Sequence, residues 1–281
     1  MNLADINTLK SLLSKEGFSF KKSLGQNFLI NPTVCPQMAE NSCNKNTGVL
    51  EIGPGVGVLT RELSKIAKKV VAIELDERLK KILPKTLGDL NNIELIFGDA
   101  MKLDLRKIIE EHFEGCESVS VCANLPYYIT SPIIMMLLES HLPITSITVM
   151  VQKEAAERIC AEVGSRSAGA VTVAVTYYAE KEILFDVNRS SFMPPPNVDS
   201  AVIKLNIRKT PPISVTNEEK FFKFVKAAFA QRRKTLLNTV NNTLNIPKDV
   251  LRNALIKLNI KETVRGEELT MEQLAQISEL I

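Results

Sequence analysis

Most of the chain alternates short runs of branched apolar residues with longer amphipathic stretches. Apolar runs of about four to eight residues are typical of buried strands, and apolar residues recurring every three or four positions are typical of helices. A helix is predicted at 59–67 and a Lys- and Leu-rich helix after the second strand. Because strands and helices alternate, we expect an α/β domain with a mainly parallel, doubly wound sheet. Its predicted strands are 49–52, 70–74, 93–97, 119–122 and 147–151.

The pattern changes near residue 207. Residues 202–207 alternate apolar and polar side chains, which predicts one more strand that could run antiparallel to the others. The segment Lys209-Thr210-Pro211-Pro212 then interrupts regular structure. We expect a large domain at 1–207, with an N-terminal extension at 1–47, and a small all-α domain at 208–281. The helices predicted in the small domain are 217–230, 232–243, 248–258 and 270–280.

Composition limits the class of protein. With 281 residues, 45% of them hydrophobic and 24% charged, the chain has the composition of an ordinary globular protein. Apolar runs such as 133–138 are too short to cross a bilayer, and no apolar signal segment follows Met1, so we expect no membrane association. The five cysteines are widely spaced without a C-x-x-C pair. Their spacing disfavours disulfides and a metal site, and it favours a cytoplasmic location.

The net charge of +3 is unevenly distributed along the chain. From Arg208 onward there are thirteen Lys/Arg and eight Asp/Glu. Between Lys220 and Lys248 there are seven basic residues and no acidic one. A basic segment of this kind is typical of a nucleic-acid-binding surface. A solvated helical face is the alternative interpretation, which the charge alone does not exclude.

A glycine-rich turn follows the first predicted strand, in the segment Glu51-Ile-Gly53-Pro-Gly55-Val-Gly57-Val-Leu-Thr60. Glycines let a backbone approach a ligand closely and adopt dihedrals that other residues avoid. The spacing G-x-G-x-G differs from the G-x-G-x-x-G of dinucleotide-binding proteins, which argues against a NAD-dependent oxidoreductase. It favours a smaller ligand such as S-adenosylmethionine, whose amino-acid end needs close contact with the backbone.

Acidic residues end three successive predicted strands: Glu51, Glu74 and Asp99, the last followed by Ala100. The carboxyl ends of parallel strands line one edge of an open α/β sheet, where ligands bind. Glu74 is placed to accept hydrogen bonds from both ribose hydroxyls of the cofactor, and Asp99 to accept them from its adenine amino group. Three solvated strand-end acids are the alternative, which the neighbouring glycine turn disfavours.

The tetrapeptide Asn124-Leu125-Pro126-Tyr127 follows the fourth predicted strand. The lone pair of adenine N6 is delocalised into the ring, so this nitrogen is a poor nucleophile. The Asn124 side-chain oxygen and the Leu125 carbonyl could accept both N6 hydrogens and turn the lone pair toward a methyl donor. Pro126 stiffens the loop, and Tyr127 could stack on an extruded base. An ordinary turn is the alternative for an isolated tetrapeptide.

Residues 188–199 include three consecutive prolines and predict a stiff loop, a kind of segment that is often functional. Phe192 lies in this loop. It could cover the opposite face of an extruded base, or it could pack on the core. The only histidines, His112 and His141, lie outside every motif. Their position fits methyl transfer without a strong general base, since the amino nitrogen becomes acidic once it is methylated.

Together these residues resemble the KsgA-type ribosomal RNA adenine dimethyltransferases, a family that also includes the erythromycin-resistance (Erm) methylases. The resemblance covers nearly the whole chain, and its specificity comes from eight motifs in order. They are KKSLGQNFL (21–29), EIGPGVGVLT (51–60), IELD (73–76), GDA (98–100), NLPYYI (124–129), SFMPPPNVDSAV (191–202), QRRKTL (231–236) and RGEELT (265–270).

The resemblance implies a Rossmann-like, class I S-adenosylmethionine-dependent methyltransferase domain followed by a small helical domain that binds RNA. It implies that Tyr127 and Phe192 flank the target base. Phosphate contacts are implied for Lys21, Lys22, Arg232, Arg233 and Lys234, the last three on a helix at 220–234. The implied cofactor contacts are Asn27, Leu29, Gly53, Glu74, Asp99 and Asn124, with Gln26 beside Asn27 and with Glu51, Gly55 and Ala100 from the same motifs.

Two substrates divide this family. KsgA-type enzymes modify two adjacent adenines near the 3′ end of 16S ribosomal RNA in the nascent small subunit, and Erm enzymes modify one adenine of 23S ribosomal RNA. The modest charge and the PPPNVDSAV, QRRKTL and RGEELT motifs resemble the first group more. We therefore expect a monomeric, cytoplasmic 16S ribosomal RNA dimethyltransferase that uses S-adenosylmethionine. An Erm-type enzyme and a noncatalytic ribosome-assembly factor are the alternatives. Tyr128 stands where Asn is frequent in the family, which affects the expected wall of the pocket.

Overall fold

The computed structural model describes residues 3, 5–18 and 27–281. The chain forms two compact units: unit 1 holds residues 1–156 and 182–207, and unit 2 holds residues 157–181 and 208–281. Unit 2 therefore includes a segment that lies well before residue 207, in addition to the C-terminal part of the chain. The division into domains at 207/208 stays a prediction.

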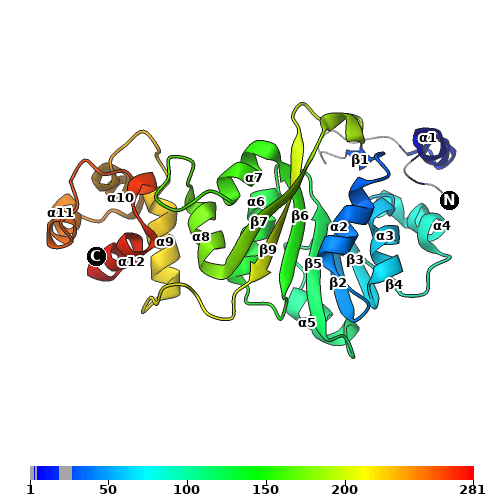
Figure 1. The fold of residues 1–281 in the computed structure, drawn as a ribbon, viewed down its shortest axis with the longest axis horizontal. Helices are drawn as coiled ribbons and strands as arrows, with labels where there is room; N and C mark the ends of the chain where they lie inside the picture. The colour runs from blue at the N-terminus through cyan, green and yellow to red at the C-terminus, as the bar shows by residue number, and fades with distance from the viewer. Residues whose placement is uncertain (1–2, 4, 19–26) are drawn as a thin grey trace. The chain divides into compact units, whose positions relative to one another are not determined.

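A seven-stranded sheet with the order β4-β3-β2-β5-β6-β9-β7 is the main sheet (Figure 1). The first five strands along this order are parallel, and β9 pairs antiparallel with β6. The predicted sheet is confirmed, and the late strand is antiparallel. The edge strand β7 (Ala179–Val187) was not predicted. The other strands are β2 (Thr47–Ile52), β3 (Lys69–Glu74), β4 (Ile93–Phe97), β5 (Ser118–Asn124), β6 (Ser146–Gln152) and β9 (Ser200–Ile207).

The central strands read as continuous apolar runs because both of their faces are covered. All six residues of β2 are buried. Helices α2 (Val34–Ser42) and α3 (Val58–Ile66) lie side by side against one face of the sheet (Figure 1), so the predicted helix at 59–67 is confirmed. The Lys- and Leu-rich segment forms a 3-10 turn, η2 (Glu77–Lys81), and a short helix, α4 (Leu83–Leu87), with Pro84 in the first turn of α4. Proline is tolerated there but not in a helix interior, so the two elements remain separate. Two further helices of unit 1 are α5 (Leu105–His112) and α6 (Thr130–Glu139). Helix α7 (Lys153–Ile159) begins in unit 1 and ends in unit 2.

The N-terminal part of unit 1 contributes α1 (Ile6–Lys15) and β1 (Phe28–Leu29). Asp5 caps α1 by accepting a hydrogen bond from the backbone N–H of Thr8 at 2.8 Å. Apolar residues of α1 join a core cluster with residues of η2 and α4. β1 pairs antiparallel with β8 (Phe192–Met193), so the predicted loop at 188–199 contains a short strand. A 3-10 turn, η3 (Arg189–Ser191), precedes it.

Unit 2 is helical. An aromatic cluster of Tyr177, Tyr178, Phe221 and Phe222 joins α8 to α9, and the Tyr178 hydroxyl donates to Glu218 Oε1 at 2.5 Å. Burial of aromatic rings against one another is a large source of stability for so small a unit. The helices are α8 (Ala170–Tyr178), α9 (Glu218–Ala228), α10 (Leu236–Leu244), α11 (Lys248–Lys257) and α12 (Met271–Leu280), with a 3-10 turn η4 (Gly266–Glu268).

The predicted helices at 217–230 and 232–243 are too long where they approach each other. α9 ends at Ala228 and α10 begins at Leu236, so Arg232, Arg233 and Lys234 lie in a turn between the helices. The predicted helix at 220–234 is therefore wrong over residues 229–234. Three successive cations are unfavourable at a helix N-terminus, where the helix dipole is positive, and this favours a turn over a helical start. The helices predicted at 248–258 and 270–280 are confirmed.

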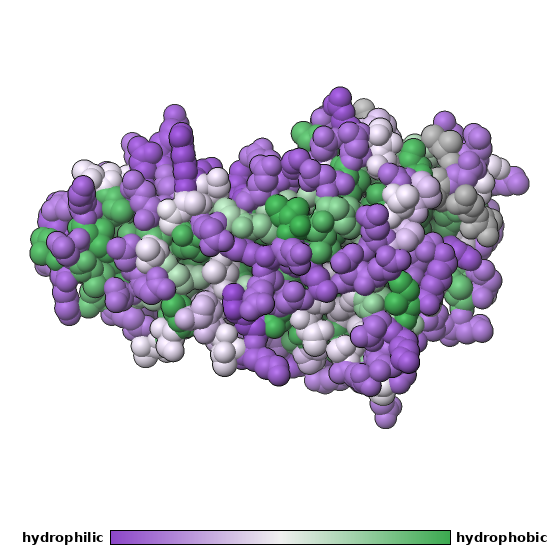
Figure 2. Space-filling view, viewed as in Figure 1, coloured by the Kyte–Doolittle hydropathy of each residue, from purple (hydrophilic) through white to green (hydrophobic). Residues whose placement is uncertain are grey.

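Hydrophilic residues cover most of the face seen in Figure 2, with apolar residues in scattered groups. Within the part of the chain that the structure describes, each helix is too short or too polar to cross a membrane. Apolar residues of unit 1 are concentrated instead in two core clusters, one between the sheet and α2 and α3, and one beneath α1.

Candidate active site

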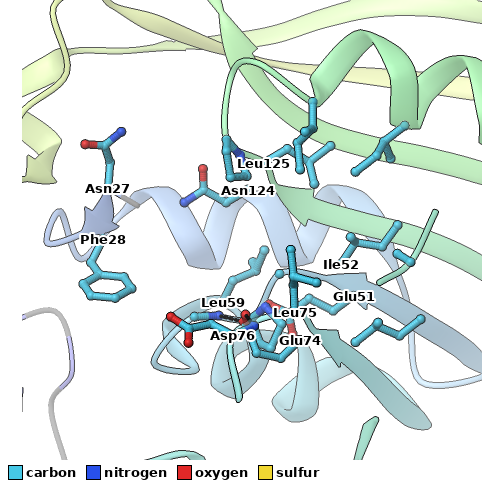
Figure 3. Close-up of a pocket in the computed structure, with 18 of the residues that line it drawn as sticks. Asn27, Phe28, Glu51, Ile52, Leu59, Glu74, Leu75, Asp76, Asn124 and Leu125 are labelled. Atoms are coloured by element: carbon cyan, nitrogen blue, oxygen red, sulfur yellow. Dashed lines mark hydrogen bonds between the residues drawn. The ribbon is translucent and has the colours of Figure 1, made fainter. Parts of the chain in front are cut away.

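A cavity of about 370 Å³ opens in unit 1 at the carboxyl ends of β2, β3 and β5, with β1 and β8 also contributing to its wall (Figure 3). Gln26, Lys21 and Lys22 lie outside the described residues. Every other residue that the sequence predicted for the cofactor or base site lines this cavity. They are Asn27, Leu29, Glu51, Gly53, Gly55, Glu74, Asp99, Ala100, Asn124, Leu125, Pro126, Tyr127 and Phe192.

The glycine turn after β2 forms the floor of the cavity. Gly55 has a φ of +59°, and a side chain there would begin 3.1 Å from the ring of Phe28. Gly57 has a φ of +91°, and a Cβ atom there would lie 2.8 Å from Leu87. Both positions therefore require glycine, for conformation and for space. The positive φ values are the unusual dihedrals that the glycines predicted, and the close approach of this backbone to a ligand stays a prediction.

Glu74 connects the end of β3 to this turn. Its Oε2 accepts a hydrogen bond from the Gly55 backbone N–H at 3.0 Å, and its Oε1 accepts one from the Asp76 N–H at 2.7 Å. Burial raises the pKa of the Glu74 carboxyl, and these two hydrogen bonds oppose the rise. Each carboxylate oxygen has a second lone pair. The group can therefore hold the turn and still accept hydrogen bonds from a pair of ligand hydroxyls.

Glu51 is the most deeply buried carboxyl group of the cavity, with 1% of its surface exposed. Burial raises its pKa to about 8, the nearby Thr60 hydroxyl opposes the rise, and the Glu74 charge adds to it. Among the described residues, neither Glu51 oxygen has a partner within hydrogen-bonding geometry. A buried acceptor without a donor is unfavourable, and a cationic ligand group would relieve it. The amino group of S-adenosylmethionine fits this requirement.

Asp99 lies at the rim with two apolar side chains beside it. Its Oδ1 accepts a hydrogen bond from the Met101 N–H at 3.0 Å, and the ammonium group of Lys102 lies 3.5 Å from Oδ2. Leu75 and Met101 both line the cavity, and they are 51% and 44% exposed. Large apolar side chains that remain exposed inside a cavity are suited to cover the faces of a flat ring.

Asn124 is the last residue of β5, and its carboxamide is drawn at the cavity in Figure 3. The loop that follows is held at both ends. The Pro126 carbonyl accepts hydrogen bonds from the Ile129 N–H at 3.1 Å and from the Thr130 hydroxyl at 3.2 Å, which leads the chain into α6. The Tyr127 hydroxyl lies 2.8 Å from the Ser200 hydroxyl. Burial raises the pKa of Tyr127, so the phenol stays neutral.

Phe192 belongs to β8, where it pairs with Leu29 of β1. It is 3% exposed and packs in the core cluster around α2, and it also lines the cavity. This burial agrees with the interpretation that Phe192 packs on the core. Contact with a target base stays a prediction for this residue.

The three basic residues of the turn after α9 belong to unit 2 and are exposed. Arg232 donates a hydrogen bond from Nη2 to the Arg166 carbonyl at 2.8 Å. This hydrogen bond holds the Arg232 guanidinium group on the surface of unit 2. Phosphate binding by Arg232, Arg233 and Lys234 stays a prediction.

Comparison with known protein families decides the affiliation of the chain. A family model described as "Ribosomal RNA adenine dimethylase" matches residues 17–281. The chain belongs to the ribosomal RNA adenine dimethylase family. The ribosomal RNA small subunit methyltransferase A of Bacillus pumilus is 48% identical to this chain over 278 residues, which are 97% of this chain and 94% of the relative.

Two solved structures resemble this chain over most of its length. A dimethyladenosine transferase from Plasmodium falciparum is 30% identical with a TM-score of 0.71, and the match covers 89% of this chain and 95% of that one. The 23S ribosomal RNA methyltransferase ErmE is 27% identical with a TM-score of 0.65, over 90% of this chain and 99% of that one. The Rossmann-like class I methyltransferase fold expected from the sequence is thereby confirmed.

Sequence reasoning missed several residues of the cavity. Leu75 follows Glu74, the last residue of β3, and Met101 follows Ala100 of the GDA motif, so their positions beside the acidic motifs were the available signal. Phe28 stands inside the quoted KKSLGQNFL motif, but only its contact with Gly55 reveals its place in the cavity wall. Tyr128, where the sequence departs from the common family pattern, also lines the cavity and is largely exposed.

Proposed function

We propose that this protein transfers methyl groups from S-adenosylmethionine to N6 of two adjacent adenines near the 3′ end of 16S ribosomal RNA, in the nascent small ribosomal subunit. The observation that carries the proposal is the joint location of the buried acids and of Asn124 on one cavity. The near full-length similarity to ribosomal RNA small subunit methyltransferase A supports the choice of subunit. A substrate of this kind is found in the cytoplasm, and we propose a monomeric enzyme there.

The proposed cofactor arrangement follows the chemistry of the cavity from floor to rim. Glu51 would bind the amino group, Asn27 and Leu29 of the cavity lining would also contact the cofactor, and Glu74 would accept hydrogen bonds from the ribose hydroxyls. Asp99 would accept hydrogen bonds from the adenine amino group while Leu75 and Met101 cover the ring. Bound in this way, the cofactor supplies an electrophilic methyl group on its sulfonium.

The base side of the mechanism rests on Asn124 and the loop after it. The Asn124 side-chain oxygen and the Leu125 carbonyl would accept the two N6–H bonds and direct the nitrogen lone pair toward the methyl group. N6 would form a bond to the methyl carbon as the bond from that carbon to the sulfonium sulfur breaks, which leaves S-adenosylhomocysteine, and the nitrogen would then lose a proton to water. A second molecule of cofactor would be needed for the same transfer to the monomethylated amine. Tyr127, held through its hydroxyl by Ser200, would present its ring to an extruded base.

RNA binding would use the basic turn of unit 2. Arg232, Arg233 and Lys234 are proposed to contact phosphates, together with Lys21 and Lys22. Contacts with phosphates fix the position of the RNA and weaken with salt, and they carry little sequence information. Selection of the two adenines would therefore depend on the shape of the assembling subunit and on the cavity around Asn124.

The decisive experiment measures transfer of labelled methyl groups to unmethylated small subunits and, separately, to protein-free 23S RNA, with the product nucleosides identified. We expect dimethyladenosine in an adjacent pair on the small subunit. We expect Asn124→Ala to fold normally and to transfer methyl groups about 10²–10³-fold more slowly, since a preorganised group aimed at the reacting atom is lost. Dimethyladenosine on 23S RNA alone would make this an Erm-type enzyme. Transfer to neither RNA would favour a noncatalytic assembly factor.

A further inference from the structure

Arg78 lies behind the cavity wall and is held there by Asp76. In η2, Nε of Arg78 donates to Asp76 Oδ1 at 2.8 Å and Nη2 donates to Oδ2 at 2.5 Å. Asp76 lines the cavity and is 7% exposed, and its N–H donates to Glu74 Oε1 at 2.7 Å. Arg78 is not among the residues that line the cavity. Asp76 therefore links Arg78 to Glu74, whose carboxylate is the proposed ribose-binding group.

The same guanidinium group also contacts the N-terminal segment. Its carbon atom lies 4.7 Å from the centre of the Phe18 ring, which follows α1. The centre of the Phe18 ring lies 6.3 Å from that of Phe28. Phe28 lines the cavity and lies against Gly55 in the glycine turn. A cation over an aromatic ring is attracted by the negative face of the ring, and the attraction strengthens as the cation is desolvated.

Two routes therefore lead from Arg78 to the same glycine. One runs through Asp76 and Glu74, whose Oε2 accepts the hydrogen bond of the Gly55 N–H. The other runs through Phe18 and Phe28, whose ring lies 3.1 Å from the position that a Cβ atom would take at Gly55. Because both routes start at Arg78 and end at Gly55, they form a ring of contacts that restricts the glycine turn and the Glu74 carboxylate together. A wall that is already ordered before binding lowers the entropy lost when a ligand binds.

We propose that Arg78 is a positioning residue for the cofactor: it links the N-terminal helix α1 to the glycine turn and to Glu74, so that cofactor binding and the docking of α1 stabilise each other. The inference rests on the proposed cofactor site. Linkage of this kind is reciprocal, because a ligand that favours the ordered wall must also favour the docked helix.

The planar fork of the guanidinium group is needed for both contacts. It engages both oxygens of Asp76 while its face covers the Phe18 ring. A lysine at this position keeps the charge but offers a point charge in place of the fork. Arg78→Met keeps an apolar stem of similar length and removes the charge. We expect the affinity for S-adenosylmethionine to fall about 10-fold in Arg78→Met and less in Arg78→Lys.

A matched control lies on the same 3-10 turn. Lys80 pairs with Glu77 at 2.9 Å, and its ammonium group lies 5.1 Å from the centre of the Phe97 ring. It thus makes the same two kinds of contact as Arg78, but neither Glu77 nor Phe97 lines the cavity. Lys80→Met should leave cofactor affinity unchanged and should control for loss of a cation from η2.

The experiment combines calorimetry with S-adenosylmethionine, kcat at saturating cofactor, and hydrogen exchange of α1 amides with and without S-adenosylhomocysteine. We expect Arg78→Met to raise Kd and KM for the cofactor with little change in kcat. We expect ligand to protect α1 amides in the wild type and in Lys80→Met, and to lose this effect in Arg78→Met. Phe18→Leu, which breaks only the aromatic route, should show the same loss of linkage and serves if Arg78→Met does not fold.

The inference would be overturned by an unchanged Kd in Arg78→Met or by an equal rise of Kd in Lys80→Met. It would also be overturned if the ligand still protects α1 amides in Arg78→Met. A fall in kcat at unchanged Kd would also overturn it, since it would indicate a role in the chemical step. Absence of cofactor binding by the wild type would instead overturn the proposed function, and this inference with it.

Discussion

The backbone N–H of Gly55 donates a hydrogen bond of 3.0 Å to Oε2 of Glu74, which joins the glycine turn after β2 to the carboxyl end of β3. The two residues are nineteen positions apart in the chain. The adjacent strands β2 and β3 bring them together, with Ile52 opposite Ile73 at the end of the ladder. Glu74 therefore shapes the turn before any ligand arrives.

Replacing Glu74 tests this double role. In Glu74→Gln an amide NH₂ would face either the Gly55 or the Asp76 N–H, so one donor loses its acceptor. A hydrogen bond to a charged group contributes about 1.5–3 kcal/mol, so we expect affinity for S-adenosylmethionine to fall about 10- to 100-fold in calorimetry. The control is Glu94→Gln on β4, which pairs with Lys69 away from the cavity. Equal affinities of Glu74→Gln and wild type would contradict the ribose assignment.

Glu51 predicts a pH dependence of stability in the cofactor-free protein. Burial raises the pKa of this carboxyl from 4.5 to about 8, so between these values the folded state holds a proton that the unfolded chain has released. The contribution of Glu51 to the free energy of unfolding therefore falls as pH rises from about 4.5 to about 8. Glu51→Gln does not titrate, and its Tm should vary less over this window. Identical pH profiles of Tm for the two proteins would exclude the raised pKa.

The same carboxyl predicts proton release when the cofactor binds. An ammonium group beside Glu51 favours the ionised carboxylate, so its pKa should fall on binding. At pH 7 the binding enthalpy should then depend on the ionisation enthalpy of the buffer, with close to one proton released in the wild type and none in Glu51→Gln. A binding enthalpy independent of buffer would place the amino group elsewhere.

The contact between Tyr127 and Ser200 predicts an effect on RNA substrates alone. A neutral hydrogen bond contributes about 0.5–1.5 kcal/mol. Its loss in Ser200→Ala should therefore lower kcat/KM for the small subunit about 2- to 10-fold. The Kd for the cofactor should not change. Tyr127→Phe should behave alike, and the double variant should be no worse than either single one. Additive losses in the double variant would show that the two hydroxyls act independently.

The basic turn of unit 2 predicts a salt effect. Removing one phosphate contact lowers the dependence of binding on salt by about one unit in the slope of log K against log salt. Arg233→Ala should show this decrease in binding to small subunits across a series of salt concentrations. Lys45→Ala is the control, because Lys45 is exposed and precedes β2 at the edge of the sheet away from the cavity. An unchanged slope in Arg233→Ala would remove Arg233 from the RNA interface.

Much of the cavity could be predicted from sequence because its residues adjoin strand ends. The runs at 49–52, 70–74 and 119–122 are buried on both faces, and continuous apolar runs of this kind can be recognised locally. Once their strands are parallel and adjacent, Glu51, Glu74 and Asn124 must meet at one edge of the sheet. The topology of the βαβ unit is therefore sufficient to predict that these motifs lie close together in space.

The pair β1–β8 shows the limit of that reasoning. Each strand has two residues, Phe28–Leu29 and Phe192–Met193, which is too short to show a period of two. Their partners are far apart in the chain, and no local pattern encodes the pairing. The place of Phe28 against Gly55, the exposure of Leu75 and the position of Arg78 between Asp76 and Phe18 depend on the same kind of long-range packing.

The amino-acid sequence by itself determined the sheet, the glycine turn, the acids at the strand ends and the family, since each depends on patterns within one or two elements. Only the tertiary structure decided that residues 157–181 pack with the C-terminal helices, that the Arg232–Lys234 segment is a turn, and that Glu51 is an unpartnered buried acid. Burial and hydrogen-bond partners are properties of neighbours in space. A residue acquires them only when distant segments of the chain have packed around it.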